Sequence, residues 1–170
     1  MTALIKQSIP DDGAAGFVTH EVLNQPGAFE NYNAYSGDKP LVEAVRMFGA
    51  DWATDHLERA GTTVGSQKIQ SLARQANRHL PELRTHDRFG DRIDLVEFHP
   101  AYHELMSLIY GCETHSFAWT HDRAGAHVAR AALSYLWNQG ENGICCPMGM
   151  TFASIPRSGT IPACSLNGRP

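Results

Sequence analysis

Apolar residues recur at intervals of three and four along most of this chain, which is the spacing of one face of an α-helix. Glycine, proline and capping residues divide the pattern into separate stretches. We predict helices over residues 39–48, 51–61, 66–77, 100–111 and 121–140, and a further helical turn or two from about Pro147.

The boundaries of the first two helices follow from their flanking residues. Asp38 is suited to cap the first helix, Pro40 to its first turn and Gly49 to its end. The face predicted to be buried holds Leu41, Val42, Val45 and Phe48. Gly61 is the predicted stop of the second helix. The residues of that helix predicted to point inward are Trp52, Leu57 and Ala60.

The longest predicted helix, 121–140, is rich in alanine, which allows close packing between helices. Asp122 is its expected cap, and Gly140 is its expected C-terminal stop. The predicted buried stripe consists of Ala124, Val128, Ala131, Ala132, Tyr135 and Leu136.

Residues 79–100 break the helical pattern. Two short extended pieces flank the turn-forming segment 88–91, and Ile93 and Leu95 alternate with polar residues. A small β-hairpin is therefore predicted here.

The first 38 residues are rich in Gly, Pro, Asn and Asp, which favour turns. They also hold more aromatic residues than a free tail would carry, namely Phe17, Phe29, Tyr32 and Tyr35. We predict an irregular, extended arm over 1–38 that lies on another surface, a helical domain over 39–155 and a tail over 156–170. The fold class is all-α with one small hairpin.

Length and composition indicate one soluble globular domain. The 170 residues are 42% hydrophobic and 19% charged. No apolar run approaches the roughly 20 residues that span a bilayer, and the N-terminus lacks the features of a signal peptide. The net charge of −4, with acidic residues interleaved among the arginines of 74–92, argues against a nucleic-acid-binding surface. A cytoplasmic protein with no membrane partner is the expectation.

The segment FHPAYHELM, residues 98–106, places two histidines four residues apart, a spacing that can hold a metal on a helix. Pro100 argues against this because the residue before a proline is held out of the helical region. We therefore expect His99 at the N-cap, His103 in the first turn, and Glu104 there as a complement to the helix dipole. A metal site is not predicted.

No other catalytic pattern is present in the sequence. It contains no H-E-x-x-H, G-x-S-x-G, Walker loop or G-x-G-x-x-G. Cys112 and Ser134 have no identifiable base partner, and the six-residue spacing of His115, His121 and His127 does not keep one helical face. The cysteines, Cys112, Cys145, Cys146 and Cys164, show no zinc-ligand spacing and are expected as thiols. We predict no catalytic, cofactor-binding or metal-binding residue.

Five segments together resemble one family: VLNQP, LVEAVRMFGADW, VEFHPAYHELM, FAWTHDRAGAHVARAALSYL and CPMGMTFASIP. From about Asn24 to Ile155 the chain is similar to the N-terminal helical domain of the adaptive-response (AidB-type) acyl-CoA dehydrogenase homologues. The resemblance implies a bacterial flavoprotein linked to DNA alkylation damage. Such proteins are several-fold longer, with a helical N-terminal domain, a β domain and a helical bundle.

The resemblance also implies that full-length members bind FAD, form homotetramers and bind DNA through the C-terminal region. The segments that contact flavin, supply the catalytic carboxylate and bind DNA follow the MTFA helix, so no functional residue is carried over. We expect this chain to be an N-terminal fragment of an FAD oxidoreductase, without flavin or dehydrogenase activity of its own. We also expect self-association, because faces that pack on other domains would be exposed.

Two alternatives belong to other classes. The chain would act as a standalone helical interaction module if its arm engaged a partner, or as a metal protein if its nine histidines bound a transition metal. The end of the chain, RSGTIPACSLNGRP, departs from the family pattern, and one permissible codon set shifted by a single base gives family-like residues. Out-of-frame reading after Pro156 is therefore a hypothesis that the gene sequence tests.

Overall fold

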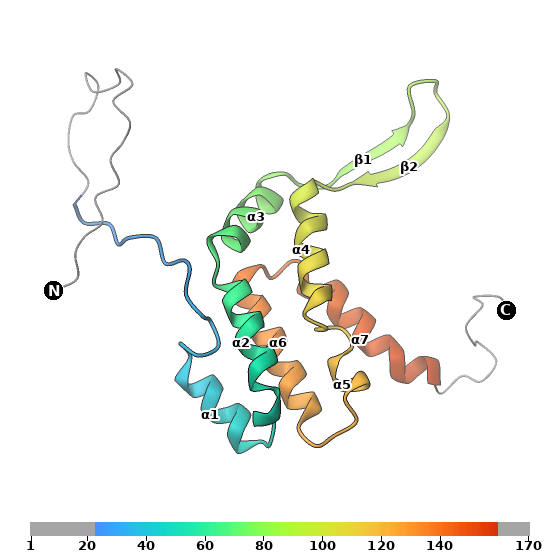
Figure 1. Cartoon of the computed structure of the whole chain (residues 1–170). Helices are drawn as coiled ribbons and strands as arrows, with labels where there is room; N and C mark the ends of the chain where they lie inside the picture. The colour runs from blue at the N-terminus through green and yellow to red at the C-terminus, as the bar shows by residue number, and fades with distance from the viewer. Residues whose placement is uncertain (1–22, 160–170) are drawn as a thin grey trace.

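The computed structural model describes residues 23–159 and shows a bundle of helices with one β-hairpin attached (Figure 1). The elements run in the order α1 (Lys39–Met47), the 3-10 turn η2 (Asp51–Ala53), α2 (Thr54–Val64), α3 (Gln67–Arg78), β1 (Glu82–His86), β2 (Arg92–Glu97), α4 (Pro100–Gly111), α5 (Phe117–Thr120), α6 (Ala126–Gly140) and α7 (Cys145–Gly159). The predicted fold class, all-α with one small hairpin, is confirmed.

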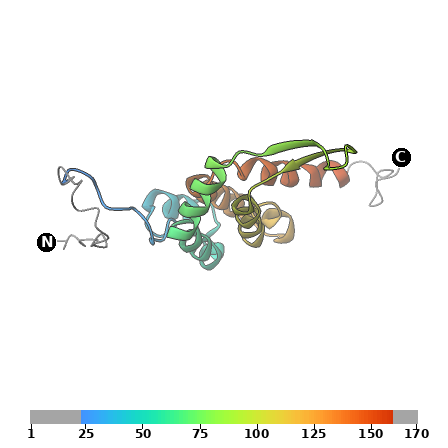
Figure 2. The ribbon, with the colours of Figure 1, turned by 90° about the horizontal axis from the view of Figure 1, so that it is seen from above.

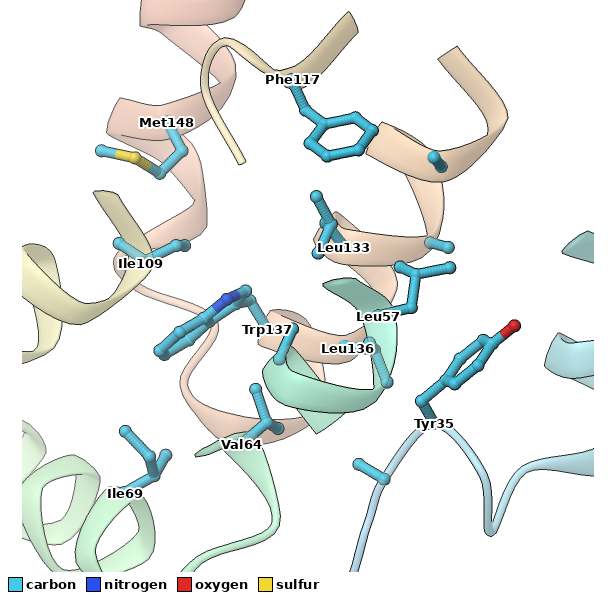
Figure 3. Packing of buried hydrophobic residues seen from close by; sticks show 14 of the residues in the cluster. Tyr35, Leu57, Val64, Ile69, Ile109, Phe117, Leu133, Leu136, Trp137 and Met148 are labelled. Atoms are coloured by element: carbon cyan, nitrogen blue, oxygen red, sulfur yellow. The ribbon is translucent and has the colours of Figure 1, made fainter. Parts of the chain in front are cut away.

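Helix α6 lies at the centre of the bundle, where it contacts α1, α2, α3, α5 and α7, while α4 packs on α3. Its inward face supplies six buried residues, Ala126, Ala129, Ala132, Leu133, Leu136 and Trp137. Figure 3 shows the indole of Trp137 among Val64 of α2, Ile69 of α3 and Ile109 of α4. Fully burying one large apolar side chain contributes about 1.5–3 kcal/mol, so this shared core holds the helices together.

The buried stripe of α6 differs from the predicted one. Ala124, Ala131 and Tyr135 are exposed rather than buried. The Tyr135 hydroxyl donates a hydrogen bond to Asp38 Oδ2 at 3.2 Å on the surface, and Trp137 takes an inward position instead. The helix is apolar around much of its circumference, so the sequence alone does not decide which of its residues face the core.

The predicted start of α6 is also corrected. Asp122 does not cap the helix, which begins at Ala126, after Gly125. Gly125 has a φ of +83°, in the left-handed region that favours glycine, and a Cβ there would meet the backbone of Gly49 and Ala50. The close approach of two turns, rather than a side-chain cap, therefore sets this end of the helix.

Three helices begin at side-chain caps, and two of these, at α1 and α4, are the predicted ones. Asp38 Oδ1 accepts the N–H of Leu41 at 3.0 Å, and Ser66 Oγ accepts the N–H of Ile69 at 3.3 Å. The third cap, at α4, is described below. In α1, however, the predicted inward residue Phe48 is the C-cap and is 64% exposed, because the helix ends before it.

Gly61 does not end the second helix, which continues to Val64 with Gly65 as its C-cap. The glycines instead accommodate the arm. The N–H groups of Asn31 and Ala34 donate to the carbonyls of Gly65 and Gly61 at 2.7 and 3.0 Å. The Asn33 side-chain amide also donates to the carbonyl of Glu58 at 3.0 Å. Residues 29–35 of the arm thus lie on α2 and α3, as predicted for the arm, whereas residues 23–28 are exposed and extend away from the bundle (Figure 1). Phe17 lies outside the described residues.

The hairpin projects beyond the ends of α3 and α4 (Figure 1), and in the view from above its strands overlie α7 in projection (Figure 2). Its strands pair antiparallel, with Glu82 opposite Glu97, Leu83 opposite Val96 and Arg84 opposite Leu95. Asp87 Oδ1 accepts the N–H groups of Phe89 and Asp91, at 2.8 and 3.0 Å, which closes the turn. Every residue of both strands is exposed.

Helix α7 begins at Cys145, before the predicted Pro147, and continues to Gly159. It therefore passes the boundary predicted at residue 155, so the first residues of the predicted tail are helical. Residues 160–170, which include Cys164, lie outside the described part, and the out-of-frame hypothesis stays a prediction. Between residues 23 and 159 no helix is long and apolar enough to cross a membrane.

Candidate functional site

The segment FHPAYHELM forms the start of α4 and gives the predicted N-cap. His99 has extended backbone, with φ −61° and ψ 143°, and Pro100 follows in the first turn. The imidazole Nδ1 of His99 accepts the N–H of Ala101 at 3.2 Å. His99 is thus a capping residue, and this ring nitrogen is already used by the backbone.

The two histidines of this segment face different partners. The ring of His99 stacks on His79, which follows α3, with centroids 4.6 Å apart and planes 12° apart. The ring of His103 meets Phe98 and Tyr102 edge-on, with centroids 6.1 and 5.7 Å away. Within residues 23–159 no group of three His, Cys, Asp or Glu side chains is arranged to hold a metal ion.

Glu104 makes an ion pair rather than complementing the helix dipole. Its Oε1 lies 2.6 Å from Nζ of Lys68 on α3, and both side chains are about half exposed or more. An exposed pair of this kind contributes about 0–1 kcal/mol. The pair helps to fix the position of α3 relative to α4, so Glu104 has a structural role rather than a catalytic one.

The stacked histidines lie beside a cavity of about 240 Å³ at the base of the hairpin, lined also by Leu80, Glu82, Glu97 and Phe98. Small-molecule sites usually measure about 300–1,000 Å³. This cavity is smaller, and its lining within the described chain brings no nucleophile next to a base.

A larger cavity, about 460 Å³, lies between the arm and α1, and its lining includes Phe29, Tyr32, Asp38 and Lys39. The rings of Phe29 and Tyr32 stack there, with centroids 4.1 Å apart. Asp38 is occupied by its helix cap and by Tyr135. Among the described residues of the lining, Lys39 is the one cation.

The other histidines singled out from the sequence also pack on aromatic rings or bond to backbone. The ring of His115 meets Tyr110 at 4.5 Å, and that of His127 meets Trp119 at 5.1 Å. The His121 Nδ1 lies 3.0 Å from the Phe117 carbonyl. These rings belong to separate neighbourhoods, so the structure gives them packing roles.

Three cysteines lie in the described part, and all are free thiols. Burial raises the pKa of the Cys112 thiol. Burial, with a further contribution from Glu141, raises the pKa of Cys145 to about 11, and its thiol donates to the Glu141 carbonyl at 3.6 Å. Raised pKa values oppose thiolate formation, so neither group is an activated nucleophile.

The neighbouring thiols Cys145 and Cys146 predict a measurable difference in reactivity. Cys146 is exposed, whereas Cys145 is half-buried with a raised pKa. At about pH 8 iodoacetamide should modify Cys146 first, and the rate at Cys145 should rise about tenfold per pH unit up to its pKa, because the thiolate is the reacting form. Peptide mass spectrometry after timed alkylation measures both rates. Equal rates at Cys145 and Cys146 at about pH 8 would contradict the raised pKa of Cys145.

Comparison with known proteins decides the family. The model of the adaptive response protein AidB N-terminal domain matches residues 24–164. This chain belongs to the AidB N-terminal domain family. The match begins where the resemblance begins in the sequence, at Asn24, and runs past Ile155 into the predicted tail.

One curated relative and one solved structure define how far the AidB relationship extends. The AidB protein of Escherichia coli strain K12, which carries the name of a putative acyl-CoA dehydrogenase, is 45% identical over 139 residues. Those residues are 81% of this chain and 26% of the relative, so the chain spans about a quarter of its length. The crystal structure of Caenorhabditis elegans ACDH-11 in complex with C11-CoA has a TM-score of 0.68 at 20% identity, covering 86% of this chain and 27% of that one. This likeness shows the fold.

The AidB N-terminal domain is thus present here as a helical scaffold. The residues singled out from the sequence are brought to helix caps, aromatic stacks and surface ion pairs, and the structure does not gather them into one site. Sequence reasoning missed the stack of His79 on His99 and the open edge of β1. No periodic signal links the two histidines, because the pairing of β1 with β2 is what brings the two ends of the hairpin together.

Proposed function

We propose that this chain serves as the N-terminal helical domain of an acyl-CoA-dehydrogenase-like flavoprotein of the DNA alkylation response, and that it neither binds FAD nor oxidises acyl-CoA by itself. The membership of residues 24–164 in the AidB N-terminal domain family carries this proposal. A domain of this kind contributes a helical face to a larger assembly, and the flavin chemistry belongs to the rest of such a protein.

The linings of the arm cavity and the hairpin-base cavity argue against FAD binding there. The diphosphate of a dinucleotide needs convergent backbone N–H groups at a helix N-terminus, or a cluster of cations. The arm cavity has one cation among its described lining residues, Lys39, beside the carboxylate of Asp38, and the hairpin-base cavity is lined by Glu82 and Glu97. These linings would repel a diphosphate or bind it weakly.

The surface supports a role in assembly. Large apolar side chains are exposed on three separate parts of the described chain: on α1, on the hairpin and on α7, including Met47, Phe48, Leu83, Phe89, Met150 and Ile155. Contiguous exposed apolar patches mark surfaces that a partner or another domain covers, and each of these three parts contributes large apolar side chains to such a surface. We therefore expect the isolated chain to self-associate.

The flavin part of the proposal predicts a colourless protein. Purified chain incubated with excess FAD and then dialysed should retain no visible flavin absorbance, because neither the arm cavity nor the hairpin-base cavity offers a diphosphate cradle. Acyl-CoA and an artificial electron acceptor should give no turnover above a blank without protein.

Escherichia coli AidB, incubated with FAD and dialysed in the same way, is the full-length protein against which the retained flavin absorbance is compared. Stoichiometric flavin retained by this chain through dialysis would overturn the proposal. Binding of a stoichiometric transition metal, measured by elemental analysis, would instead favour a metal protein.

A further inference from the structure

The β-hairpin has a free strand edge and no other element of the described chain packed against its strands. All residues of β1 and β2 are exposed, and among elements of the described chain each strand's extensive contacts are with the other strand. A lone two-stranded hairpin is marginally stable in water, and an open edge is a template for another strand. The hairpin is therefore incomplete as a sheet.

The two edges differ in what they can pair with. Between the pairs Arg84–Leu95 and His86–Arg92, β2 contains one residue more than β1, which is a bulge in β2. Within this bulge Asp94 has a φ of +43°, and its Oδ2 accepts from Arg92 Nε at 2.8 Å. A bulge of this kind blocks regular pairing along an edge. The edge of β1, Glu82–His86, carries no extra residue and is the open one.

One charged side chain on β1, Glu82, lacks a partner of opposite charge within the described part of one copy. Glu82 stands directly opposite Glu97, and like charges in that position are unfavourable. Arg84 Nη1 lies 3.1 Å from Glu97 Oε2 and relieves that carboxylate. Glu82 has no ion-pair partner among residues 23–159. The edge strand thus presents an anion that lacks a cation, two residues from an arginine.

We propose that β1 of two copies of this chain pair antiparallel about a two-fold axis at Leu83, forming a four-stranded sheet. This register places Leu83 opposite the second copy's Leu83 and places Glu82 opposite the second copy's Arg84, twice by symmetry. Opposite charges facing each other across strands are stabilising. Val96 lies opposite Leu83 within each hairpin, so one face carries a continuous row of apolar side chains, a valine and a leucine from each copy.

The charges select this register over its neighbour. Moving the axis by one residue, to Arg84, would place the two arginines directly opposite each other and leave Glu82 facing His86 of the second copy. Two-fold pairing also uses the same strand twice, as isologous dimers do. This inference concerns the hairpin alone and is independent of the flavoprotein role, so the flavin experiment can fail without affecting it.

Disulfide cross-linking tests the axis. In the full chain, Leu83→Cys should form a covalent dimer under a mild oxidant, because opposite Cα atoms in an antiparallel pair lie about 4.5–5.5 Å apart, within the range of about 4.4–6.8 Å for a disulfide. Val96→Cys is the matched control, exposed on the same face, but the two copies of Val96 would be three strand spacings, about 14 Å, apart.

The unaltered chain, with its own four cysteines, sets the background. Mass spectrometry of the Leu83→Cys dimer identifies the peptide in which position 83 of one copy is joined to position 83 of the other. Cross-linking of Leu83→Cys no faster than of Val96→Cys would overturn the proposal.

Charge reversal tests the register in solution. Glu82→Lys and Arg84→Glu should each weaken the homodimer about tenfold or more, because both changes place like charges in two symmetric pairs. An equimolar mixture of the two variants should form a heterodimer in which Lys at position 82 of one copy faces Glu at position 84 of the other. In the same heterodimer Arg84 of the first variant faces Glu82 of the second, so both pairs carry opposite charges, and it should associate more tightly than either variant alone.

Full exchange of the charges gives the stricter arm of this test. The double variant Glu82→Lys with Arg84→Glu restores opposite charges in both symmetric pairs and should recover the dissociation constant of the unaltered chain. Sedimentation equilibrium gives the dissociation constants, and circular dichroism shows that each variant is folded. A double variant no tighter than the single ones, or an unaltered chain that stays monomeric, would overturn the two-fold pairing.

Discussion

Replacing Trp137 with alanine is expected to lower the free energy of unfolding by about 3–5 kcal/mol, the usual cost of deleting a fully buried aromatic side chain. Trp137 is 0% exposed and lies where α6 meets Val64, Ile69 and Ile109 from three other helices. The loss would leave a cavity between helices that cannot collapse independently. Urea denaturation followed by far-ultraviolet circular dichroism measures the effect.

Tyr135→Ala is the matched control for this change. It removes an aromatic side chain from the same helix, but one that is 51% exposed and held by a hydrogen bond to Asp38. We expect a much smaller loss than for Trp137, because an exposed hydrogen bond exchanges readily with water. Equal losses from the two substitutions would show that the core is not centred on Trp137.

Replacing Gly65 with alanine is expected to destabilise the chain by about 1–3 kcal/mol, the range found for overpacking. A Cβ at Gly65 would overlap the carbonyl group of Tyr32, whose carbon would lie 2.9 Å away. The collision is with backbone rather than with a flexible side chain, so the arm must move. Thermal unfolding measures the stability, and hydrogen exchange of the Asn31 and Ala34 amides reports the release of the arm.

Gly149→Ala provides a control of opposite sign. Gly149 lies inside α7, and nothing in the described chain stands within 4 Å of a Cβ built there. Alanine in a helix interior is about 1 kcal/mol more favourable than glycine, so this variant should be slightly more stable. If Gly65→Ala stabilised the chain in the same way, the close docking of the arm would be refuted.

Local signals in the sequence are enough where a single residue decides an outcome. Asp38 and Ser66 cap their helices with their own side chains, and Pro100 holds His99 outside α4. The hairpin is also predictable, since the turn residues around Gly90 interrupt a helical pattern. Each of these follows from short-range chemistry, which a reader of one sequence can evaluate.

Sequence reasoning fails where distant segments meet. The phase of α6 depends on which neighbours cover it, and Tyr135 turns outward because Asp38 of the α1 cap is available as its partner. Glycine commonly ends helices, which predicts a stop at Gly61, but the role of Gly61 is to admit the backbone of Tyr35. Such contacts join residues far apart in sequence and leave no periodic signal.

The docking of the arm also has a kinetic meaning. The Gly65 carbonyl receives the N–H groups of both Asn31 and Tyr32, and it is available to them because α2 ends there. Helices form in about a microsecond, whereas contacts between segments far apart in sequence close later. Asn31 lies 34 residues before its acceptor Gly65, whereas Val64 lies 73 residues before Trp137 in the shared core. We therefore expect the arm to dock on the end of α2 before α6 closes the core around Trp137.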